Sequence, residues 1–230
     1  SIHCEQGFSL LGVMADGGMA EYIKIPANKL IELPSGLDVA IASLVEPLAV
    51  AVHGVDRAHV READRVLIIG AGPIGLAIGA VLRGRGIAYD ITARYPHQQQ
   101  AAERLGGKLR ADGHYDVVMD AIGSAASLKQ STTRVKPMGR IGLVGMFWEP
   151  TKLEQAFWAK EAVLIPAAGY YCKSPSRSFD EARTLLHQYP DIAQALITHR
   201  YPLEGVTEAF HTAGTRAAGA IKVVFDIGKR

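Results

Sequence analysis

The sequence has little cysteine and no long run of charge of one sign. Its 230 residues include only two cysteines, Cys4 and Cys172, which excludes a disulfide network and a four-cysteine zinc site built by this chain alone. The 25 basic and 23 acidic residues give a net charge of +2, so we expect neither a nucleic-acid partner nor a polybasic membrane surface. The composition favours a small-molecule partner and a reducing, cytoplasmic location.

The longest uncharged apolar stretch, residues 66–82, is also interrupted. It approaches the roughly 20 residues of a membrane span, but Gly70, Gly72, Pro73 and Gly75 lie in its middle. We therefore interpret it as a strand, a tight turn and a helix, and expect no membrane association. Hydrophobic residues make up 48% of the chain and charged residues 21%, which is typical of a folded globular protein.

Strand-like and helix-like runs alternate along the middle of the chain. Such alternation predicts an α/β fold with a doubly wound parallel sheet. The predicted strands are residues 65–70, 89–94, 115–123, 139–146 and 162–171, and the predicted helices are 74–86, 97–107, 125–137 and 178–189. Residues 108–115 are too few for a crossover that contains its own strand, so the second helix should run almost directly into the next strand. Residues 196–202 and 220–227 read as strands around a helix at 203–214.

The N-terminal part reads differently. Residues 20–26 and 29–34 each end in proline and predict short strands of an antiparallel sheet or barrel. Residues 37–57 have helical spacing, with a break predicted at Glu46-Pro47 because proline suits the start of a new helix. The carboxylate of Glu46 would then be free to face a cleft.

The run GAGPIG follows a predicted strand and opens a predicted helix. In this context Gly70 permits the tight turn, Gly72 allows the backbone to approach a diphosphate, and Gly75 allows close packing of helix and strand. The helix N-terminus adds free N–H groups that favour phosphate. The motif predicts a dinucleotide site formed by Gly70, Gly72, Pro73, Ile74 and Gly75. An α/β fold that binds another adenosine compound, such as a methyl donor, is the alternative.

A residue about 20 positions beyond this motif should meet the adenosine ribose. Arg94 lies there, at the end of the second predicted strand. An acid would bind the ribose hydroxyl of NAD, whereas arginine suits the 2′-phosphate of NADP, so NADP is favoured over NAD. The alternative is a solvated charge at a strand end. Asp90 is acidic but lies at the start of the strand, the wrong end for the ribose.

Several segments together resemble the zinc-type medium-chain dehydrogenase/reductase family, which contains alcohol and polyol dehydrogenases. They are DGGMAEYIKIP, LVEPLAVAVHGV, VLIIGAGPIGL, YDVVMDAIGS, GRIGLVGM, LITHRYPLEGVTEAF and AIKVVFDIG. The resemblance implies a Rossmann domain at residues 37–190 and parts of a GroES-like substrate domain at 1–36 and 191–230. It also implies zinc-assisted hydride transfer between NAD or NADP and an alcohol or polyol.

The resemblance also assigns residues. It implies that the strand ends lining the cofactor are Ile122, Gly123, Val144, Gly145 and Met146, that Lys222 reaches the cofactor phosphates, and that Glu46 is the carboxylate near the catalytic zinc. The upstream ligand motifs of the family are not in this sequence, and Cys4 resembles only the last cysteine of the structural-zinc lobe. We expect a partial chain that does not bind zinc well by itself, and we assign no catalytic residue.

Two other functions stay open at this stage. One is a dinucleotide-binding module without catalysis, and the other is a zinc-independent reductase of the quinone-oxidoreductase type. A serine hydrolase is poorly supported because no G-x-S-x-G motif occurs, and Ser124 is expected to cap a helix. The substrate would be a small alcohol or carbonyl compound. By analogy with the family, residues 139–146 and 162–171 would pair subunits into a homodimer or homotetramer.

Overall fold

The computed structural model describes residues 10–170 and 175–228. Its strands are β1 (Val66–Ile69), β2 (Tyr89–Thr92), β3 (Tyr115–Asp120), β4 (Val135–Leu143), β5 (Val163–Pro166), β6 (Ile197–Tyr201) and β7 (Lys222–Phe225). Its α-helices are α1 (Val45–Arg57), α2 (Pro73–Gly84), α3 (Pro96–Arg104), α4 (Ala125–Arg134), α5 (Gln155–Ala159), α6 (Pro175–Gln188), α7 (Asp191–Leu196) and α8 (Val206–Gly214). Short 3₁₀ helices occupy Ala27–Lys29, Val39–Leu44, Leu203–Gly205 and Arg216–Ala218.

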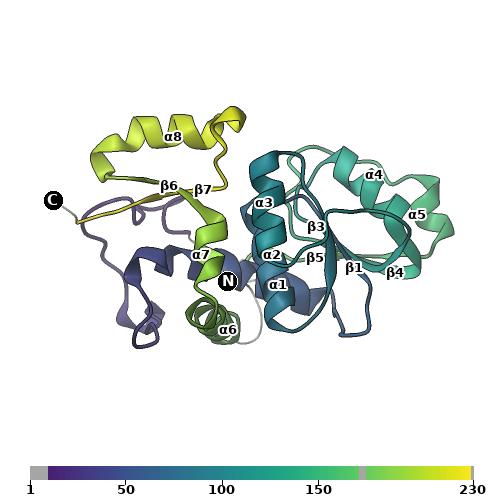
Figure 1. Ribbon diagram of the computed structural model, residues 1–230, viewed down its shortest axis with the longest axis horizontal. Coiled ribbons are helices and arrows are strands. Elements are labelled where there is room, and N and C mark those ends of the chain that lie inside the picture. Colours follow the sequence, from purple (N-terminus) through teal and green to yellow (C-terminus); the bar gives the residue numbers. More distant parts are fainter. Residues whose placement is uncertain (1–9, 171–174, 229–230) are drawn as a thin grey trace.

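The main sheet has five parallel strands in the order β2-β1-β3-β4-β5. Helix α2 leads from β1 outward to β2, whereas α4 leads from β3 outward to β4 in the opposite direction. Because crossovers between parallel strands are right-handed in nearly all folds, these two directions place α2 and α4 on opposite faces. Helices α1, α2 and α3 cover one face, and α4 and α5 cover the other (Figure 1). The predicted doubly wound α/β fold is confirmed.

The core explains why the central strands are continuous apolar runs. All four residues of β1 are buried, as is Val118 on β3. One set of side chains, including Ile68 and Met119, packs with the side of the sheet that α1 and α2 cover. The other set, including Leu67 and Ile69, packs beneath α4 and α5. Strands buried on both faces need apolar residues at every position rather than at alternate ones.

A second, two-stranded sheet lies at the end of the molecule away from α4 and α5 (Figure 1). Its strands β6 and β7 are parallel, and α8 connects them. These elements follow the strand, helix and strand predicted for residues 196–227. The arrangement returns the chain toward α1 and places Lys222 at the start of β7.

The crossover from β2 to β3 is short, as predicted. After α3, Lys108 forms one isolated parallel bridge with Asp90 on the outer edge of β2, and the chain then passes directly to β3. Two backbone hydrogen bonds make this bridge, from Ile91 N to the Lys108 carbonyl and from Lys108 N to the Tyr89 carbonyl. A single bridge replaces a full strand at this edge.

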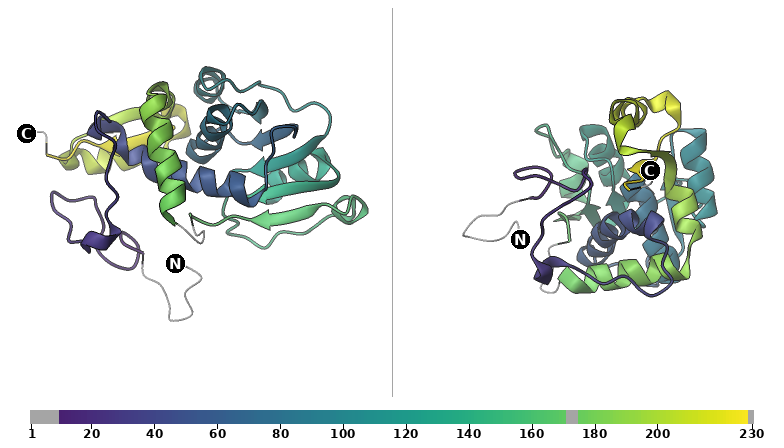
Figure 2. Two further views of the ribbon diagram at one scale, coloured as in Figure 1. Left: turned by 90° about the horizontal axis from the view of Figure 1, so that it is seen from below. Right: turned by 90° about the vertical axis from the view of Figure 1, so that its left-hand side faces the viewer.

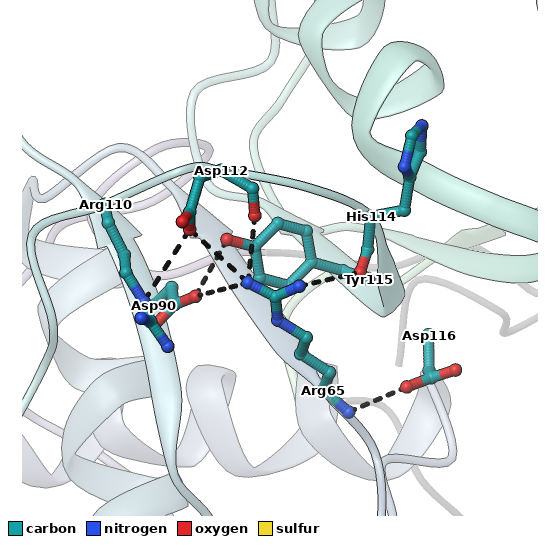
Figure 3. A network of polar contacts seen from close by, with 7 residues as sticks. All are labelled: Arg65, Asp90, Arg110, Asp112, His114, Tyr115 and Asp116. Atoms are coloured by element: carbon teal, nitrogen blue, oxygen red, sulfur yellow. Dashed lines mark hydrogen bonds and ion pairs between the residues drawn. The ribbon is translucent and has the colours of Figure 1, made fainter.

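A cluster of polar side chains holds residues 108–114 against the starts of β1 and β3 (Figure 3). The buried carboxylate of Asp90 accepts hydrogen bonds from Arg110 Nε, at 2.9 Å, and from Tyr115 Oη, at 2.8 Å. Arg65 donates to the backbone carbonyl of Asp112 at 2.9 Å and lies over the ring of Tyr115. Because a buried carboxylate is costly without partners, these contacts account for Asp90 in the core.

The expected strands near the N-terminus were wrong. Within residues 10–38 of the described chain no strand forms: Lys29 ends the 3₁₀ helix Ala27–Lys29, and the rest of residues 20–26 and 29–34 has no regular secondary structure. Tyr22 is 92% exposed and Leu30 is 64% exposed. The physical reason is that a strand needs the N–H and C=O groups of a neighbouring strand, and no neighbouring strand lies alongside these residues in the described part of the chain.

The helical break predicted at Glu46-Pro47 lies slightly earlier, between Leu44 and Val45. The 3₁₀ helix Val39–Leu44 ends where α1 begins, and Glu46 and Pro47 lie in the first turn of α1. Residues 39–57 are long and apolar enough to cross a membrane by length and composition. In the structure α1 instead packs as a core helix against α2 and α6 (Figure 2).

Candidate functional site

The glycine loop lies at the carboxyl end of β1, between β1 and β3, where the crossovers change direction. Gly70 has a φ of +98°, a conformation that favours glycine, and its N–H donates to Thr92 Oγ1 at 3.0 Å. Gly72 is the N-cap of α2 and Pro73 follows at the first helical position. In open α/β sheets, ligands bind at such a point of reversal.

The start of α2 has the features that favour a negatively charged group. The N-cap of α2 makes no side-chain hydrogen bond, and the first N–H groups of a helix have no acceptor within the helix. A Cβ atom added to Gly72 would meet nothing within 4 Å. Ile74 is partly exposed beside it. Open space and free N–H groups therefore occur together at Gly72.

Two further loops meet the glycine loop. A Cβ on Gly70 would lie 2.6 Å from Ile122 Cγ1. A Cβ on Gly123 would lie 2.4 Å from the carbonyl oxygen of Met146, and one on Gly145 would lie 2.4 Å from Gly123 N. The structure thus brings together the loops after β1, β3 and β4, on which the family resemblance places the expected cofactor-lining residues.

The side chains at these strand ends differ in exposure. Ile122 is 51% exposed and Met146 is 62% exposed, although both follow buried strands. Val144 is partly buried and packs toward Gly54 of α1, where an added Cβ would lie 2.9 Å from Val144 Cγ2. The two exposed apolar side chains offer surface against which flat rings could pack.

Arg94 lies just beyond the carboxyl end of β2, which is the first strand in the sheet order. It is exposed, and no ion pair of Arg94 occurs among the described residues. Its guanidinium lies 5.4 Å from the ring centre of Tyr95, which stacks on His97 at 5.7 Å. Arg94 therefore presents a free positive charge at the rim of the site.

Glu46 and Lys222 are far apart in the sequence but electrostatically close in the fold. Although Glu46 keeps exposed surface, burial of its carboxyl group raises its pKa, and the positive charge of Lys222 opposes that rise. Lys222 is partly buried at the start of β7. Glu46, which the resemblance places near zinc, and Lys222, which it places at the cofactor phosphates, thus lie in one region of the fold.

The described residues do not form a metal site. Within residues 10–170 and 175–228, no three or more His, Cys, Asp or Glu side chains gather closely enough to hold an ion. A catalytic zinc commonly has three protein ligands, so Glu46 does not fit that group without further ligands. Cys4 and Cys172 lie outside the described residues.

Sequence reasoning missed two residues that shape the site. Thr92 accepts the hydrogen bond from Gly70, and Asp120 accepts hydrogen bonds from Ile122 N and Gly123 N at 2.9 and 3.1 Å. The signal for Asp120 was present, because an acid that ends a buried apolar strand requires an explanation. Ser124, as expected, caps α4 by accepting from Ser127 N.

Comparison with known proteins agrees with this geometry. Residues 39–227 match the family described as glucose dehydrogenase C-terminus. L-galactonate-5-dehydrogenase of Escherichia coli K12 is 26% identical over 225 residues, which cover 90% of this chain and 65% of that protein. The chain therefore spans less than two thirds of that relative's length.

Two solved structures share the fold. An alcohol dehydrogenase from E. coli CFT073, complexed with NADH, superposes with a TM-score of 0.83 at 24% identity, covering 97% of this chain and 73% of the other. A protein of Sinorhizobium meliloti 1021 described as a zinc-binding dehydrogenase, bound to NADP, gives 0.80 at 26% identity, covering 93% and 67%. The chain belongs to the glucose dehydrogenase C-terminus family, and its relatives are the zinc-type alcohol and polyol dehydrogenases that its sequence resembles.

Proposed function

We propose that this chain binds NAD or NADP as the cofactor-binding part of an alcohol or polyol dehydrogenase. One observation carries the proposal: the glycine loop, the uncapped start of α2 and the loops after β3 and β4 meet at the carboxyl ends of the strands. The relatives support the same reading, since one is a dehydrogenase of a sugar acid and two structural neighbours carry NADH or NADP.

The residues divide the work of binding. Gly72 and the N–H groups of Ile74 and Gly75 would hold the diphosphate, because they combine open space with donors that have no acceptor within the helix. Ile122 and Met146 would pack against the rings of the cofactor, and Lys222 would balance phosphate charge. A bound nicotinamide would supply the hydride-transfer chemistry. The loops after β3 and β4 would exclude water from one side of the ring and set its orientation.

The free positive charge of Arg94 supports a preference for NADP. The 2′-phosphate distinguishes NADP from NAD, and an arginine binds phosphate through paired, charge-assisted hydrogen bonds. Arg94 has no carboxylate partner in the described part of the chain, so its charge is available. Binding of a 2′-phosphate by Arg94 would therefore not require an ion pair to be broken first.

The substrate would be a small alcohol, polyol or carbonyl compound. We place the cofactor domain at residues 37–190 and the substrate lobe at 1–36 and 191–230. Glu46 would supply one carboxylate near a catalytic zinc, but the described residues do not complete such a site, and we derive no step through the metal. A cytoplasmic location fits this chemistry.

The outer edge of β5 supports a proposed homodimer or homotetramer. β5 is the last strand of the sheet, and Val163 on it is 51% exposed. An unpaired edge strand can pair with the same strand of a second copy. Analytical ultracentrifugation of the chain tests this directly.

Titration calorimetry with NADPH and with NADH tests the proposed function. We expect micromolar binding of at least one cofactor, tighter for NADPH, and no binding of S-adenosylmethionine. A screen of alcohols with added zinc, and of quinones with a chelator, then separates dehydrogenase from quinone reductase. Cofactor binding without turnover of either substrate class would favour a binding module, and absence of cofactor binding would refute the proposal.

A further inference from the structure

Asp120 ends β3 where the strand meets the cofactor loops, and its side chain is fully buried. Its Oδ1 atom accepts hydrogen bonds from the backbone N–H groups of Ile122, at 2.9 Å, and Gly123, at 3.1 Å. Hydrogen bonds to a carboxylate are stronger than those between neutral groups. The side chain therefore ties the turn at Ile122 and Gly123 to the end of the strand.

The backbone carbonyl of Asp120 ties down the neighbouring loop as well. It accepts hydrogen bonds from Val144 N and Gly145 N, both at 2.9 Å. One residue thus holds the loop after β3 with its side chain and the loop after β4 with its main chain. Both loops carry residues that the proposed function places against the cofactor.

These loops have no room to move independently. The Gly145 position lies against Gly123 N, the Gly123 position lies against the Met146 carbonyl, and the Gly70 position lies against Ile122. Gly123 also has a φ of +76°, which only a specific turn imposes. A shift of this turn would therefore press on Met146 in one direction and on Gly70 in the other.

The second carboxylate oxygen of Asp120 indicates why an acid occupies this position. Oδ2 is buried and has no hydrogen-bond partner in the part of the chain that the structure describes. A buried carboxylate oxygen without a partner costs free energy of folding. Stability alone would favour an apolar residue in this strand, so the benefit of the acid lies in the turn that it holds.

We propose that Asp120 is a positioning residue for the nicotinamide cofactor, acting through the hydrogen bonds that its side chain accepts from the backbone of Ile122 and Gly123. The inference rests on the proposed function, because it requires that these loops face the cofactor. Because its side chain is fully buried, Asp120 would act without touching the cofactor. Its effect is to keep the exposed side chain of Ile122 and the adjoining loops in the geometry that a bound cofactor requires.

Two substitutions and a matched control test the role. Asp120→Ala removes the acceptor, whereas Asp120→Asn keeps an oxygen at the position of Oδ1. The control is Asp116→Ala, because Asp116 Oδ2 also accepts a backbone N–H, from Arg65 at 2.9 Å (Figure 3). Asp116 lies at the start of β3, whereas Asp120 ends it. Titration calorimetry with NADPH and NADH, and thermal unfolding, are measured on all four proteins.

We expect Asp120→Ala to raise the Kd for both cofactors about tenfold or more, because two charge-assisted hydrogen bonds are lost. Asp120→Asn should stay within about threefold of the unaltered chain, since an acceptor remains. Asp116→Ala should lower the unfolding temperature and leave the Kd unchanged. If Asp120→Ala does not fold, Asp120→Val replaces it, because valine suits a strand and fills most of the space.

The outcomes separate this inference from the proposed function. No cofactor binding by the unaltered chain overturns both. Binding by the unaltered chain that Asp120→Ala or Asp120→Val retains in full overturns only the positioning role. An equal loss of affinity in Asp116→Ala also overturns it, because the effect would then follow stability rather than the loops.

Discussion

Gly75 packs directly against Gly70, so that a Cβ atom on Gly75 would lie 1.8 Å from the carbonyl oxygen of Gly70. Gly72, between them, has open space instead. The two positions therefore need glycine for different reasons. At Gly75 the reason is internal packing of helix against loop, and at Gly72 it is access for a ligand.

Alanine substitutions at these glycines should separate folding from binding. Gly75→Ala should destabilise the protein by about 1–3 kcal/mol or more, because the methyl group overlaps backbone that cannot move freely. Gly72→Ala should change stability by less than about 0.5 kcal/mol yet weaken NADPH binding about tenfold, because the methyl group stands where phosphate approaches. Urea unfolding and titration calorimetry measure the two effects. Similar stability losses in both variants would contradict this division.

Arg94→Gln should reverse the cofactor preference. Loss of a charged, paired contact to the 2′-phosphate should weaken NADPH binding about 10- to 100-fold, since such contacts contribute about 1.5–3 kcal/mol. NADH binding should change by less than about twofold because NADH has no 2′-phosphate. The ratio of the two Kd values is the measurement. An unchanged ratio would show that Arg94 is only a solvated charge.

Lys222→Gln should weaken both cofactors equally. Its charge would act on the diphosphate, which NAD and NADP share, so we expect an increase of about tenfold in each Kd. Arg94→Gln is the natural comparison, because it should affect NADPH alone. The increase should shrink at high salt in the unaltered chain, since screening reduces the contribution of the lysine. An effect on NADPH only would place Lys222 at the 2′-phosphate instead.

Tyr115 should make the protein sensitive to alkaline pH. Burial, and the hydrogen bond to Asp90, raise the pKa of Tyr115 from 10.0 to about 12. Because the folded state keeps this proton while the unfolded state releases it, stability falls as the pH rises from 10.0 toward about 12. Tyr115→Phe should remove this part of the fall, although it costs about 1–3 kcal/mol at neutral pH by leaving an oxygen of Asp90 without its donor.

Urea unfolding at several pH values between neutrality and the alkaline limit measures the effect of Tyr115→Phe. Tyr22→Phe is the control, because Tyr22 is 92% exposed and should behave like the unaltered chain. If the unaltered chain and Tyr115→Phe lose stability in parallel above pH 10, the titration of Tyr115 is not coupled to folding.

Much of the α/β part of the chain was predictable because its signals are local. The strand, glycine loop and helix around residues 66–84 follow from a β-branched run, the spacing of three glycines and a helical apolar face. The short crossover at residues 108–115 followed from chain length alone. Each of these features depends on neighbours within about ten residues, so the sequence carries the information directly.

Other features depend on partners distant in the chain. Residues 20–26 and 29–34 have the pattern of strands but form none in the described chain, because pairing is decided by what lies alongside and not by propensity. The closeness of Glu46 to Lys222 arises only when β7 returns to α1. The polar cluster around Asp90 arises only when residues 108–114 lie against the starts of β1 and β3.

The sequence by itself determined the doubly wound α/β architecture and the place of the glycine loop, since periodicity and turn chemistry act over short distances. Only the tertiary structure decided that Asp120 holds two loops at once and that Arg94 has a free charge in the described part of the chain. Hydrogen bonds and charges act through space, so their partners are known only after the strands have been placed side by side.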